Sequence, residues 1–388
     1  MKSIAFLIYD ERLTNGIIKT QVLNIAQHYD HKTFVLYICQ MPVILYHYNA
    51  IKRLVKKYNN IKFIFIPVAL PSRYVLYNSF LLDFVESYLS QTIRILYKYL
   101  KFDVVHCRSY FSSHIAVKSG IRSRIICDLR SLFIEENESL GLLKKGSRLY
   151  RKWVNMLIDL NSNENIIIAI NEEMKNKLVQ KYDLDSTKIY ILPLVYDPNE
   201  FELDNNNKRT YTNSIFIYIG SIGKHLWNNY DVYANYISQI KNADNGAKFI
   251  FISQKISKEA INVLTKAARD DIEFIKNPPR GVLVDKLKES DYGLIFMTES
   301  LDSDTRLAVK TVEYLAAGLA VITNKNAGSA ASIIENEELG IVVDKVISRS
   351  ELEYLKNNSV KFHEKAQNYA RAHFSIECYL NKYREIID

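Results

Sequence analysis

The stretch that decides the fold reads DYGLIFM at 291–297, TESLDSDTR at 298–306, LAVKTVEYLAAGLAVITN at 307–324 and KNAG at 325–328. Tyr292 to Met297 is a short apolar run, which is typical of a buried parallel strand. From Arg306 the apolar positions take helical spacing, Gly318 suits the left-handed residue that ends a helix, and Ala320 to Thr323 is a second buried run. This text predicts a strand–helix–strand unit, with a ligand-binding loop at the carboxyl end of its first strand.

The predicted helix carries a charged stripe. Arg306, Lys310 and Glu313 are spaced i, i+4 and i+7, so they are expected to share one helical face. One interpretation is a solvated row of ion pairs. The other is a nucleotide-sugar site, in which free backbone N–H groups at the helix start receive a diphosphate. Lys310 would then add positive charge, and Glu313 would accept hydrogen bonds from the ribose hydroxyls.

The text KTVEYLAAGLAVITN at 310–324 resembles the donor-site signature of family 4 glycosyltransferases, in its lysine variant. The resemblance implies the GT-B fold, a nucleotide-diphosphate sugar as donor, retention of anomeric configuration and no obligatory metal or other cofactor. The fuller motif of the family has two glutamates eight positions apart, and Thr305 stands where the first would be. Thr305 is assigned to the donor site, and Glu299 or the backbone of 300–306 is expected to contact the hexose. Ala308 replaces a proline that is usual in the family.

Two domains are expected, because 388 residues exceed one ordinary core. The polar text DNNNKRTYTN at 204–213 lacks periodicity and marks the boundary. The predicted fold is α/β, with two Rossmann-like domains facing across a cleft. Residues 1–200 form the acceptor-binding domain, joined by a terminal helix at 366–388, and residues 210–365 form the donor-binding domain.

The donor-binding domain opens with a predicted strand followed by GSIGKHLW at 220–227. The resemblance places this loop near the donor phosphates, where close backbone approach favours residues without a bulky Cβ. Lys224 is a weak replacement for the basic residues of the family, which leaves Lys310 and Arg306 as the main catalytic cations. The residues assigned to donor binding are Gly220, Ser221, Gly223, Lys224, Arg280, Thr305, Lys310 and Glu313.

The acceptor-binding domain has candidate residues in its first loop and at two strand ends. The text TNGIIKTQVLNIA at 14–26 is similar to the acceptor-side glycine loop of the family, which implicates Asn15 and Gly16; a simple strand-to-helix turn would need only Gly16. Two further predicted strands end in HCRS at 106–109 and DLRSLFIEE at 128–136. The polar residues at these two ends are His106, Arg108, Asp128, Arg130, Glu135 and Glu136.

The D-x-R text resembles a segment of some of these transferases, in which the first residue lies near the reacting sugar. Asp128 and Arg130 are therefore assigned to catalysis, and the alternative is an ion pair that only holds the loop. Arg108 and Glu135 are assigned to acceptor binding, and His106 to a structural role. The triplet from Asp302 to Asp304 could bind a metal in a different fold, but we interpret Asp304 as a helix N-cap.

Composition limits the partners. The net charge is +8, yet no nucleic-acid module or dense basic cluster is recognised, so nucleic-acid binding is not expected. Anionic nucleotide sugars and lipid headgroups would account for the charge equally well. The four cysteines lack metal-binding spacing and are expected to be buried thiols in a reducing cytosol. No signal peptide or run of transmembrane length is seen, so a cytoplasmic enzyme is expected, with the inner face of the membrane as an alternative location within the cytoplasm.

The function predicted from sequence is a retaining glycosyltransferase that moves a hexose-type sugar to a glycan or lipid-linked acceptor in surface polysaccharide (capsule) biosynthesis. One alternative is a nucleotide-sugar epimerase of the same fold, which would need extra acid–base carboxylates. Another is a non-catalytic relative that binds a glycan or organises a complex, which the missing glutamate at position 305 motivates.

Overall fold

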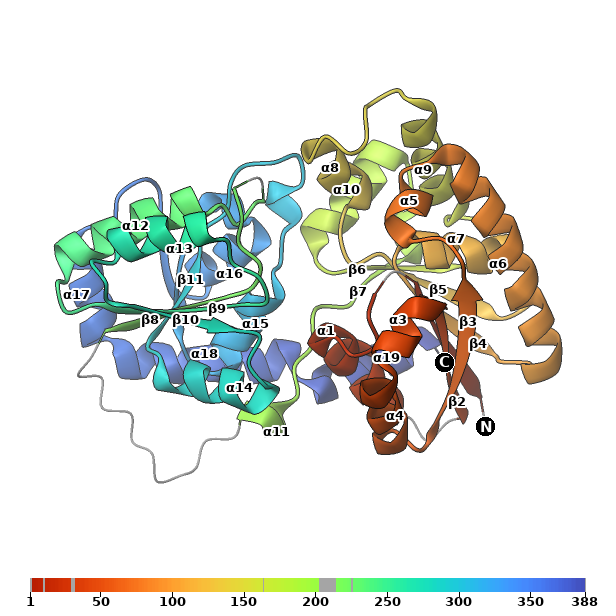
Figure 1. Cartoon of the computed structure of the whole chain (residues 1–388), viewed down its shortest axis with the longest axis horizontal. Helices are drawn as coiled ribbons and strands as arrows, with labels where there is room; N and C mark the ends of the chain where they lie inside the picture. Colours follow the sequence, from red (N-terminus) through yellow and green to blue (C-terminus); the bar gives the residue numbers. More distant parts are fainter. Residues whose placement is uncertain are drawn as a thin grey trace. The chain divides into compact units, whose positions relative to one another are not determined.

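The structure, a computed structural model, describes residues 2–9, 11–28, 32–162, 164–201, 214–224 and 226–387. The predicted linker at 204–213 lies outside the described residues. The chain divides into two compact units. The first unit consists of Met1–Pro193 with Leu380–Asp388, and the second consists of Leu194–Tyr379. Each unit is described by itself below (Figure 1).

The first unit is built on a seven-stranded parallel sheet with the order β3-β2-β1-β4-β5-β6-β7. Its central strands β1, β4 and β5 are buried along almost their whole length, because helices cover both faces of such a sheet. The helix α7 packs against β1, β4 and β5, with α6 and α9 beside it (Figure 1). The strands are β1 Ser3–Tyr9, β2 Lys32–Gln40, β3 Ile61–Val68, β4 Val104–Arg108, β5 Arg124–Asp128, β6 Ile166–Ala169 and β7 Ile189–Ile191.

The helical segments of this unit follow the strands in alternation. They are α1 Gly16–Ile18, η1 Lys19–Leu23, α2 Asn24–Gln27, α3 Met41–Tyr46, α4 Tyr48–Lys57, α5 Ser72–Leu76, α6 Ser79–Leu100, α7 Tyr110–Lys118, α8 Phe133–Ser139, α9 Arg148–Asp159, α10 Glu172–Tyr182 and η2 Ser186–Lys188. Asn171 caps α10 as its sequence position favours, accepting from the Met174 N–H at 2.9 Å. Among the described residues, no helix is both long and apolar enough to cross a bilayer.

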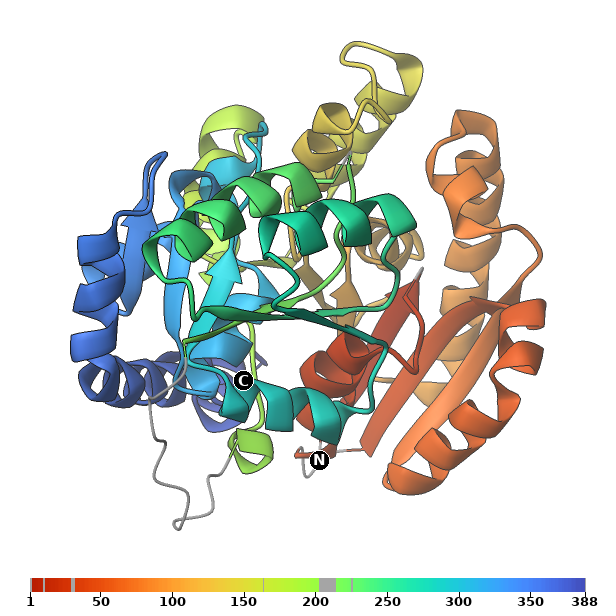
Figure 2. The ribbon, with the colours of Figure 1, turned by 60° about the vertical axis from the view of Figure 1, so that its left-hand side comes forward.

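The second unit has a six-stranded parallel sheet with the order β10-β9-β8-β11-β12-β13. Helices α12 and α13 lie on one face of this sheet and α14 on the other, as Figures 1 and 2 both show. The elements are α11 Pro198–Phe201, β8 Ile215–Ile219, α12 Tyr230–Ala243, β9 Lys248–Ser253, α13 Lys258–Ala267, β10 Ile272–Lys276, α14 Arg280–Glu289, β11 Tyr292–Ile295, η3 Ser303–Thr305, α15 Val309–Ala316, β12 Ala320–Asn324, η4 Lys325–Ala327, α16 Ser329–Asn336, β13 Gly340–Val343, α17 Arg349–Asn357, α18 Ser359–Phe374 and α19 Ile376–Ile387.

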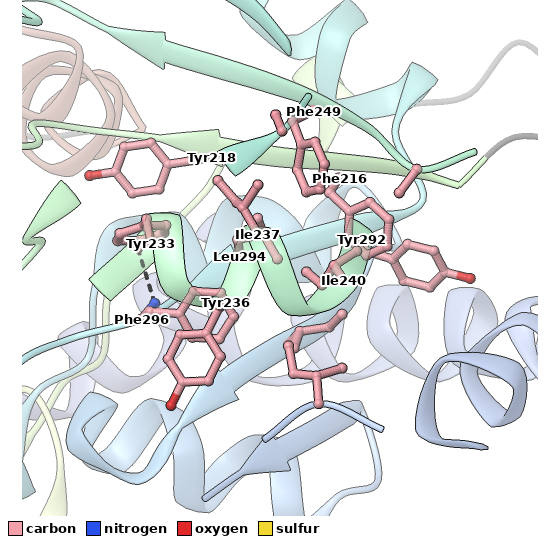
Figure 3. Close-up of a cluster of buried hydrophobic side chains, with 14 of the residues drawn as sticks. Phe216, Tyr218, Tyr233, Tyr236, Ile237, Ile240, Phe249, Tyr292, Leu294 and Phe296 are labelled. Carbon is pink, nitrogen blue, oxygen red and sulfur yellow. Dashed lines mark hydrogen bonds between the residues drawn. The ribbon is translucent and has the colours of Figure 1, made fainter. Parts of the chain in front are cut away.

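Aromatic side chains fill the core between the second sheet and α12. Tyr236 stacks on Phe296 with ring centroids 4.0 Å apart, and the backbone N–H of Phe296 donates to the Tyr233 hydroxyl at 3.0 Å (Figure 3). Tyr218 from β8 stacks on Phe251 in the same cluster. This packing anchors the start of the loop that follows β11, because Phe296 is the first residue after that strand.

A glycine sets how closely α15 approaches the sheet. A Cβ on Gly293 would lie 2.3 Å from the ring of Tyr314, which is too close for any larger residue. The Tyr314 hydroxyl in turn accepts from the Ile219 N–H at 3.0 Å. The second half of α15 is thereby held against the carboxyl end of β8. Gly318, at a φ of 75°, ends the helix as its sequence position predicted.

The last turns of α19 belong to the first unit. The Lys2 ammonium donates to the Ile387 carbonyl at 3.1 Å, and Arg124 donates to the Ile386 carbonyl at 3.2 Å. The return of the chain end to the first unit is confirmed for Leu380–Asp388, whereas residues 366–379, which the prediction also placed there, belong to the second unit. By contrast, α18 packs against α15 in the second unit.

In both sheets the strand order reverses at one place. The first unit reverses between β1 and β4, and the second between β8 and β11. Ligands of doubly wound folds bind outside the carboxyl ends of the strands at such a point. The loops after these four strands are therefore the places to look for a site in each unit.

Candidate functional site

Lys310 lies at the reversal point of the second unit. Its ammonium nitrogen donates to the Asn228 side-chain oxygen at 3.0 Å and lies 4.1 Å from the centre of the Tyr218 ring. The residue is only 8% exposed, and burial lowers the pKa of its amine to about 7. The lysine is therefore enclosed by neutral groups, which distinguishes it from a member of a surface ion-pair row.

Gly220 lies beside the Lys310 amine. This residue directly follows β8, is exposed and has a φ of 130°, which side chains rarely allow. A Cβ built on it would lie 3.4 Å from the Lys310 nitrogen. A residue without a side chain thus lies beside the amine, which is the type of residue that the sequence predicts for this loop.

The rest of the glycine loop is held by local hydrogen bonds. The Ser221 carbonyl accepts from the Tyr218 hydroxyl at 2.6 Å, and the Gly223 N–H donates to the Asn228 carbonyl at 3.1 Å. Lys224 points elsewhere, because its exposed amine lies 3.5 Å from Glu259. Lys310 and the backbone around Gly220 are thus brought together, and Lys224 is separated from them.

Arg306 differs from the prediction. The helix α15 begins at Val309, so Arg306 precedes it in extended conformation and does not share a helical face with Lys310 and Glu313. The predicted three-residue helical stripe is wrong in this respect. Extended backbone from Arg306 to Ala308 carries the chain from the short turn η3 into α15, and this places the arginine on the preceding loop.

The Arg306 guanidinium is occupied by that loop. It donates to both carboxylate oxygens of Asp302, at 3.1 and 3.3 Å, and to the Thr298 carbonyl at 3.0 Å. It also hydrogen bonds to Ser300 and stacks on Trp227, 4.7 Å from the ring centre. With 9% exposure, Arg306 joins the loop after β11 to the loop after β8.

The structure also places both aspartates of the D-x-D triplet, Asp302 and Asp304, in this loop. Asp302 pairs with Arg306, and the Thr305 hydroxyl donates to the Asp302 carbonyl at 3.0 Å. Asp304 lies inside η3, and Ala308 precedes α15, so the interpretation of Asp304 as the helix N-cap is wrong. Thr305 is buried in this turn.

Among the described residues, no group of three or more His, Cys, Asp or Glu side chains could hold a metal.

Glu313 is paired with another predicted residue. Its carboxylate accepts from Arg280, whose guanidinium also pairs with Glu200 at 2.9 Å and lies over the ring of Phe201. Burial alone would lower the pKa of Arg280, but the two glutamates outweigh it and raise the pKa. Arg280 lies on α14 and Glu313 on α15, and the structure brings these two predicted residues into direct contact.

Four polar side chains meet at the reversal point of the first unit. Arg108, the last residue of β4, donates to both oxygens of Glu11 and to the Gln21 oxygen at 3.2 Å. The same Gln21 oxygen accepts from Arg130. One nitrogen of Arg108 and the Gln21 amide nitrogen are buried without a hydrogen-bond partner. This leaves two unused donors in the cluster, which costs free energy unless a ligand or water satisfies them.

Asp128 faces Arg130 and His106 in the same cluster. One of its oxygens accepts from Arg130 at 3.2 Å and lies 3.4 Å from a His106 ring nitrogen, and its other oxygen has no partner. Burial alone would raise the pKa of Asp128, but Arg130, His106 and Arg108 lower it to about 2. His106 also hydrogen bonds to the Tyr383 hydroxyl at 2.8 Å, which ties the terminal helix to this cluster.

Backbone strain is found at the same strand ends. Ser109 after β4 has a φ of 77°, and Arg130 after β5 has a φ of 64°. Neither is a glycine, so each conformation is costly and has to be maintained by its surroundings. Such residues concentrate at functional sites, which supports the assignment of this cluster to function more than to packing.

A cavity of about 140 Å³ opens beside this cluster. Aromatic rings form most of its wall, and Glu11 and Ser109 supply polar atoms. The full lining is Tyr9, Glu11, Leu76, Ser109, Tyr110, Phe111, Phe133 and Trp153. A ring with apolar faces and polar edges, such as a sugar, matches this combination of aromatic wall and polar rim.

The other predicted acceptor residues have local roles. Glu135 is buried and accepts from Lys181 at 2.7 Å and from the Tyr182 hydroxyl at 2.6 Å, so these contacts tie α8 to α10. Asn15 caps α1 by accepting from the Ile17 N–H at 3.2 Å, and Gly16 is the first residue of that helix. The partners of Glu135 therefore lie outside the arginine cluster. The contacts of Asn15 and Gly16 match the alternative interpretation, a simple strand-to-helix turn.

Sequence reasoning missed several members of both sites. In the second unit these are Tyr218, Trp227 and Asn228, and in the first unit Glu11 and Gln21. Glu11 could have been found from its place just after the first strand. Gln21 and Asn228 lie within helical or turn text without any distinguishing pattern, and only their buried contacts reveal them.

Comparisons with known proteins agree with this architecture. No protein-family model matches the chain, and no curated protein matches it. Among solved structures, a glycosyltransferase from Rickettsia africae is similar, with a TM-score of 0.70, 16% identity and coverage of 100% of this chain and 97% of that chain.

Two further structures are similar over almost their whole length. Anabaena HepE in complex with UDP-glucose gives a TM-score of 0.68, 13% identity and coverage of 100% of this chain and 99% of that chain. WaaG, a glycosyltransferase involved in lipopolysaccharide biosynthesis, gives 0.65, 14% identity and 99% of each chain. At these identities the likeness establishes the fold. The predicted α/β fold with two Rossmann-like parallel sheets is confirmed, and it is the fold of these GT-B glycosyltransferases.

Proposed function

We propose that the protein is a glycosyltransferase that uses a nucleotide-diphosphate sugar bound to the second unit. The observation that carries this proposal is the buried Lys310 amine beside the exposed, left-handed Gly220, at the reversal point of the second sheet. The same fold in Anabaena HepE has been solved with UDP and with UDP-glucose, which supports a nucleotide-sugar donor.

In this proposal Lys310 stabilises the leaving diphosphate. Negative charge grows on the diphosphate as the glycosidic bond breaks, and a preorganised cation in a site of low dielectric stabilises that charge strongly. Arg306 has a positioning role, because its donors are used to hold the two donor loops together. Glu313 and Arg280 form the edge of the site that would hold the nucleoside. The proposal also includes a hexose-type sugar, retention of its anomeric configuration and independence from a metal. These three expectations rest on the resemblance to the lysine-variant motif.

The acceptor is assigned to the first unit. The cavity of about 140 Å³ would take one sugar ring of a glycan or lipid-linked acceptor against its aromatic wall. Asp128, with its pKa of about 2, would stay ionised and could accept from an acceptor hydroxyl through its unpartnered oxygen. The unused donors of Arg108 and Gln21 could bind the same ligand. If the ion pair only held the loop, we would not expect unpartnered hydrogen-bond donors and an unpartnered acceptor in the same cluster.

We propose a location at the membrane surface, and the surface of the first unit supports it. The 22-residue helix α6 exposes a row of large apolar side chains at spacings of four and seven, which places them on one face. They are Phe80, Phe84, Tyr88, Ile95 and Tyr99. The basic residues of α4 add positive charge to the same unit, and such a combination suits anionic lipid surfaces. Together with the lipopolysaccharide role of WaaG, this supports a cytoplasmic, peripheral enzyme of surface polysaccharide biosynthesis.

The test has two stages. Thermal unfolding is measured with a panel of nucleoside diphosphates and their sugars, because a ligand that binds only the native state raises the melting temperature. The nucleotide sugar that binds is then incubated with candidate acceptors, and free nucleotide is measured. Release that depends on the acceptor supports transfer. Conversion of the sugar without acceptor would indicate an epimerase, and binding without turnover would indicate a non-catalytic relative.

A further inference from the structure

The surroundings of the Lys310 amine are uncharged. Its side chain contacts the Tyr218 ring and the Asn228 amide, and among the described residues no carboxylate lies within 4.0 Å of its nitrogen. A buried ammonium normally requires a carboxylate partner, because removing its charge from water is costly. This amine has been placed in a site that favours its neutral form.

The titratable groups around Lys310 do not supply the missing negative charge. Tyr218 from β8 and Tyr314 from α15 stay neutral, because burial raises the pKa of each hydroxyl well above its ordinary value. Glu313, on the same helix, is committed to Arg280. Asp302, on the preceding loop, is committed to Arg306. The charges of the nearby acids are therefore already balanced by arginines.

We propose that binding of the donor diphosphate is coupled to proton uptake by Lys310, with Tyr218 and Asn228 as the positioning groups that hold the resting amine. This inference rests on the proposed function, since it concerns the same donor site. An anionic diphosphate beside Gly220 would provide the counter-charge that the protein lacks and would favour the ammonium form. A buffer molecule or water gives up the proton, which forms a third N–H bond on the amine, and no other covalent bond changes.

The contacts of the amine suit both of its protonation states. The Asn228 oxygen accepts a hydrogen bond from either a neutral amine or an ammonium, so it can keep the nitrogen in place during the change. The Tyr218 ring tolerates the neutral amine and attracts the ammonium once it forms. An aspartate at position 228 would instead stabilise the ammonium before any ligand arrives.

The proposal predicts that affinity for the donor decreases as the pH rises above the resting pKa of Lys310. Because burial lowers the resting pKa to about 7, the free amine carries only about a tenth of a proton at pH 8. If bound diphosphate restores the pKa to its ordinary range, about 0.9 proton is taken up at that pH. Affinity for the nucleotide then weakens about tenfold for each pH unit between the resting and the bound pKa.

The experiment is calorimetric titration of the full chain with UDP at pH 8, in buffers of low and high ionisation enthalpy. At this pH the terminal phosphate of UDP is already ionised, so its own titration contributes little. We expect the observed heat to depend on the buffer with close to one proton taken up. Lys266→Met, which alters an exposed lysine on α13 of the same unit, should retain the uptake. Asn228→Asp should abolish the uptake and make affinity nearly independent of pH.

A second measurement reads the resting amine directly. The side-chain nitrogen resonance of Lys310, assigned by its loss in Lys310→Met, is titrated without nucleotide and should change near neutral pH. UDP binding with no buffer dependence, or a resting amine that stays charged above pH 9, would overturn the inference and leave the proposed function standing. Failure of every nucleoside diphosphate to bind the wild-type chain would refute the proposed function, and the proton uptake with it.

Discussion

Replacing Asp128 by asparagine should make the free energy of unfolding of the first unit depend less on pH between pH 5 and pH 3. The Asp128 carboxyl is 2% exposed, and its pKa is lowered from 3.8 to about 2 by arginines and a histidine that outweigh its burial. At 1.36 kcal/mol for each pKa unit, this difference corresponds to about 2 kcal/mol of stability. Since the folded pKa is the lower one, this stability is present above pH 3.8 and is lost as the pH falls toward 2.

The two tryptophans allow each unit to be followed separately. Trp153 is buried in the first unit, and Trp227 lies in the second, so a Trp227→Phe background leaves fluorescence as a reporter of the first unit alone. Urea unfolding is measured at pH 7, 5, 4 and 3, with and without Asp128→Asn. We expect the stability gap between the two chains to be constant from pH 7 to 5 and to shrink by about 1 kcal/mol at pH 3.

The control is Asp159→Asn in the same background, because that carboxylate is on the same unit and is mostly exposed. The stability gap between this variant and the parent chain is measured at the same four pH values and serves as the reference for removal of one carboxylate from the unit. A gap for Asp128→Asn that stays constant down to pH 3 would show that the carboxyl is not held ionised by its neighbours. The reasoning about Arg108, Arg130 and His106 around this carboxylate would then be refuted.

Three further predictions concern the donor site. Lys310→Ala should lower kcat about a hundredfold, as loss of one charge-stabilising group typically does, while Glu313→Gln should mainly raise the donor KM; steady-state kinetics separate these effects, and near-normal values for both would show that neither residue acts on the donor. Gly220→Ala should weaken UDP binding in calorimetry, because its φ is unfavourable for alanine and the new Cβ would crowd the Lys310 nitrogen; unchanged affinity would contradict that approach. Arg306→Ala should destabilise the second unit by about 3 kcal/mol in urea unfolding, since it leaves Asp302 buried and unpaired; a loss below about 1 kcal/mol would contradict its role in joining the loops.

The strands were predictable because their signal is local. Short apolar runs bounded by polar text mark strands that are buried on both faces, and the run from Tyr292 is found in β11 as expected. Two series of such runs were sufficient to predict two parallel sheets. The start of α15 was not predictable in the same way. Helical spacing continues back to Arg306 in the sequence, but the side chain of that arginine gains more hydrogen bonds from the loop than a further helical turn would provide.

The sequence by itself determined the sheet-forming runs and the glycine loop after β8, and the structure places Lys310 beside Gly220 of that loop. Only the tertiary structure decided which charges are satisfied and which are not. Arg130 reaches Gln21 across 109 positions of chain, and Lys310 reaches Asn228 across 82. No local pattern records such pairs, because parallel strands bring distant loops together at one sheet edge. The free energy of a buried charge depends on those distant neighbours, and this is why the uncharged surroundings of Lys310 appear only in the folded chain.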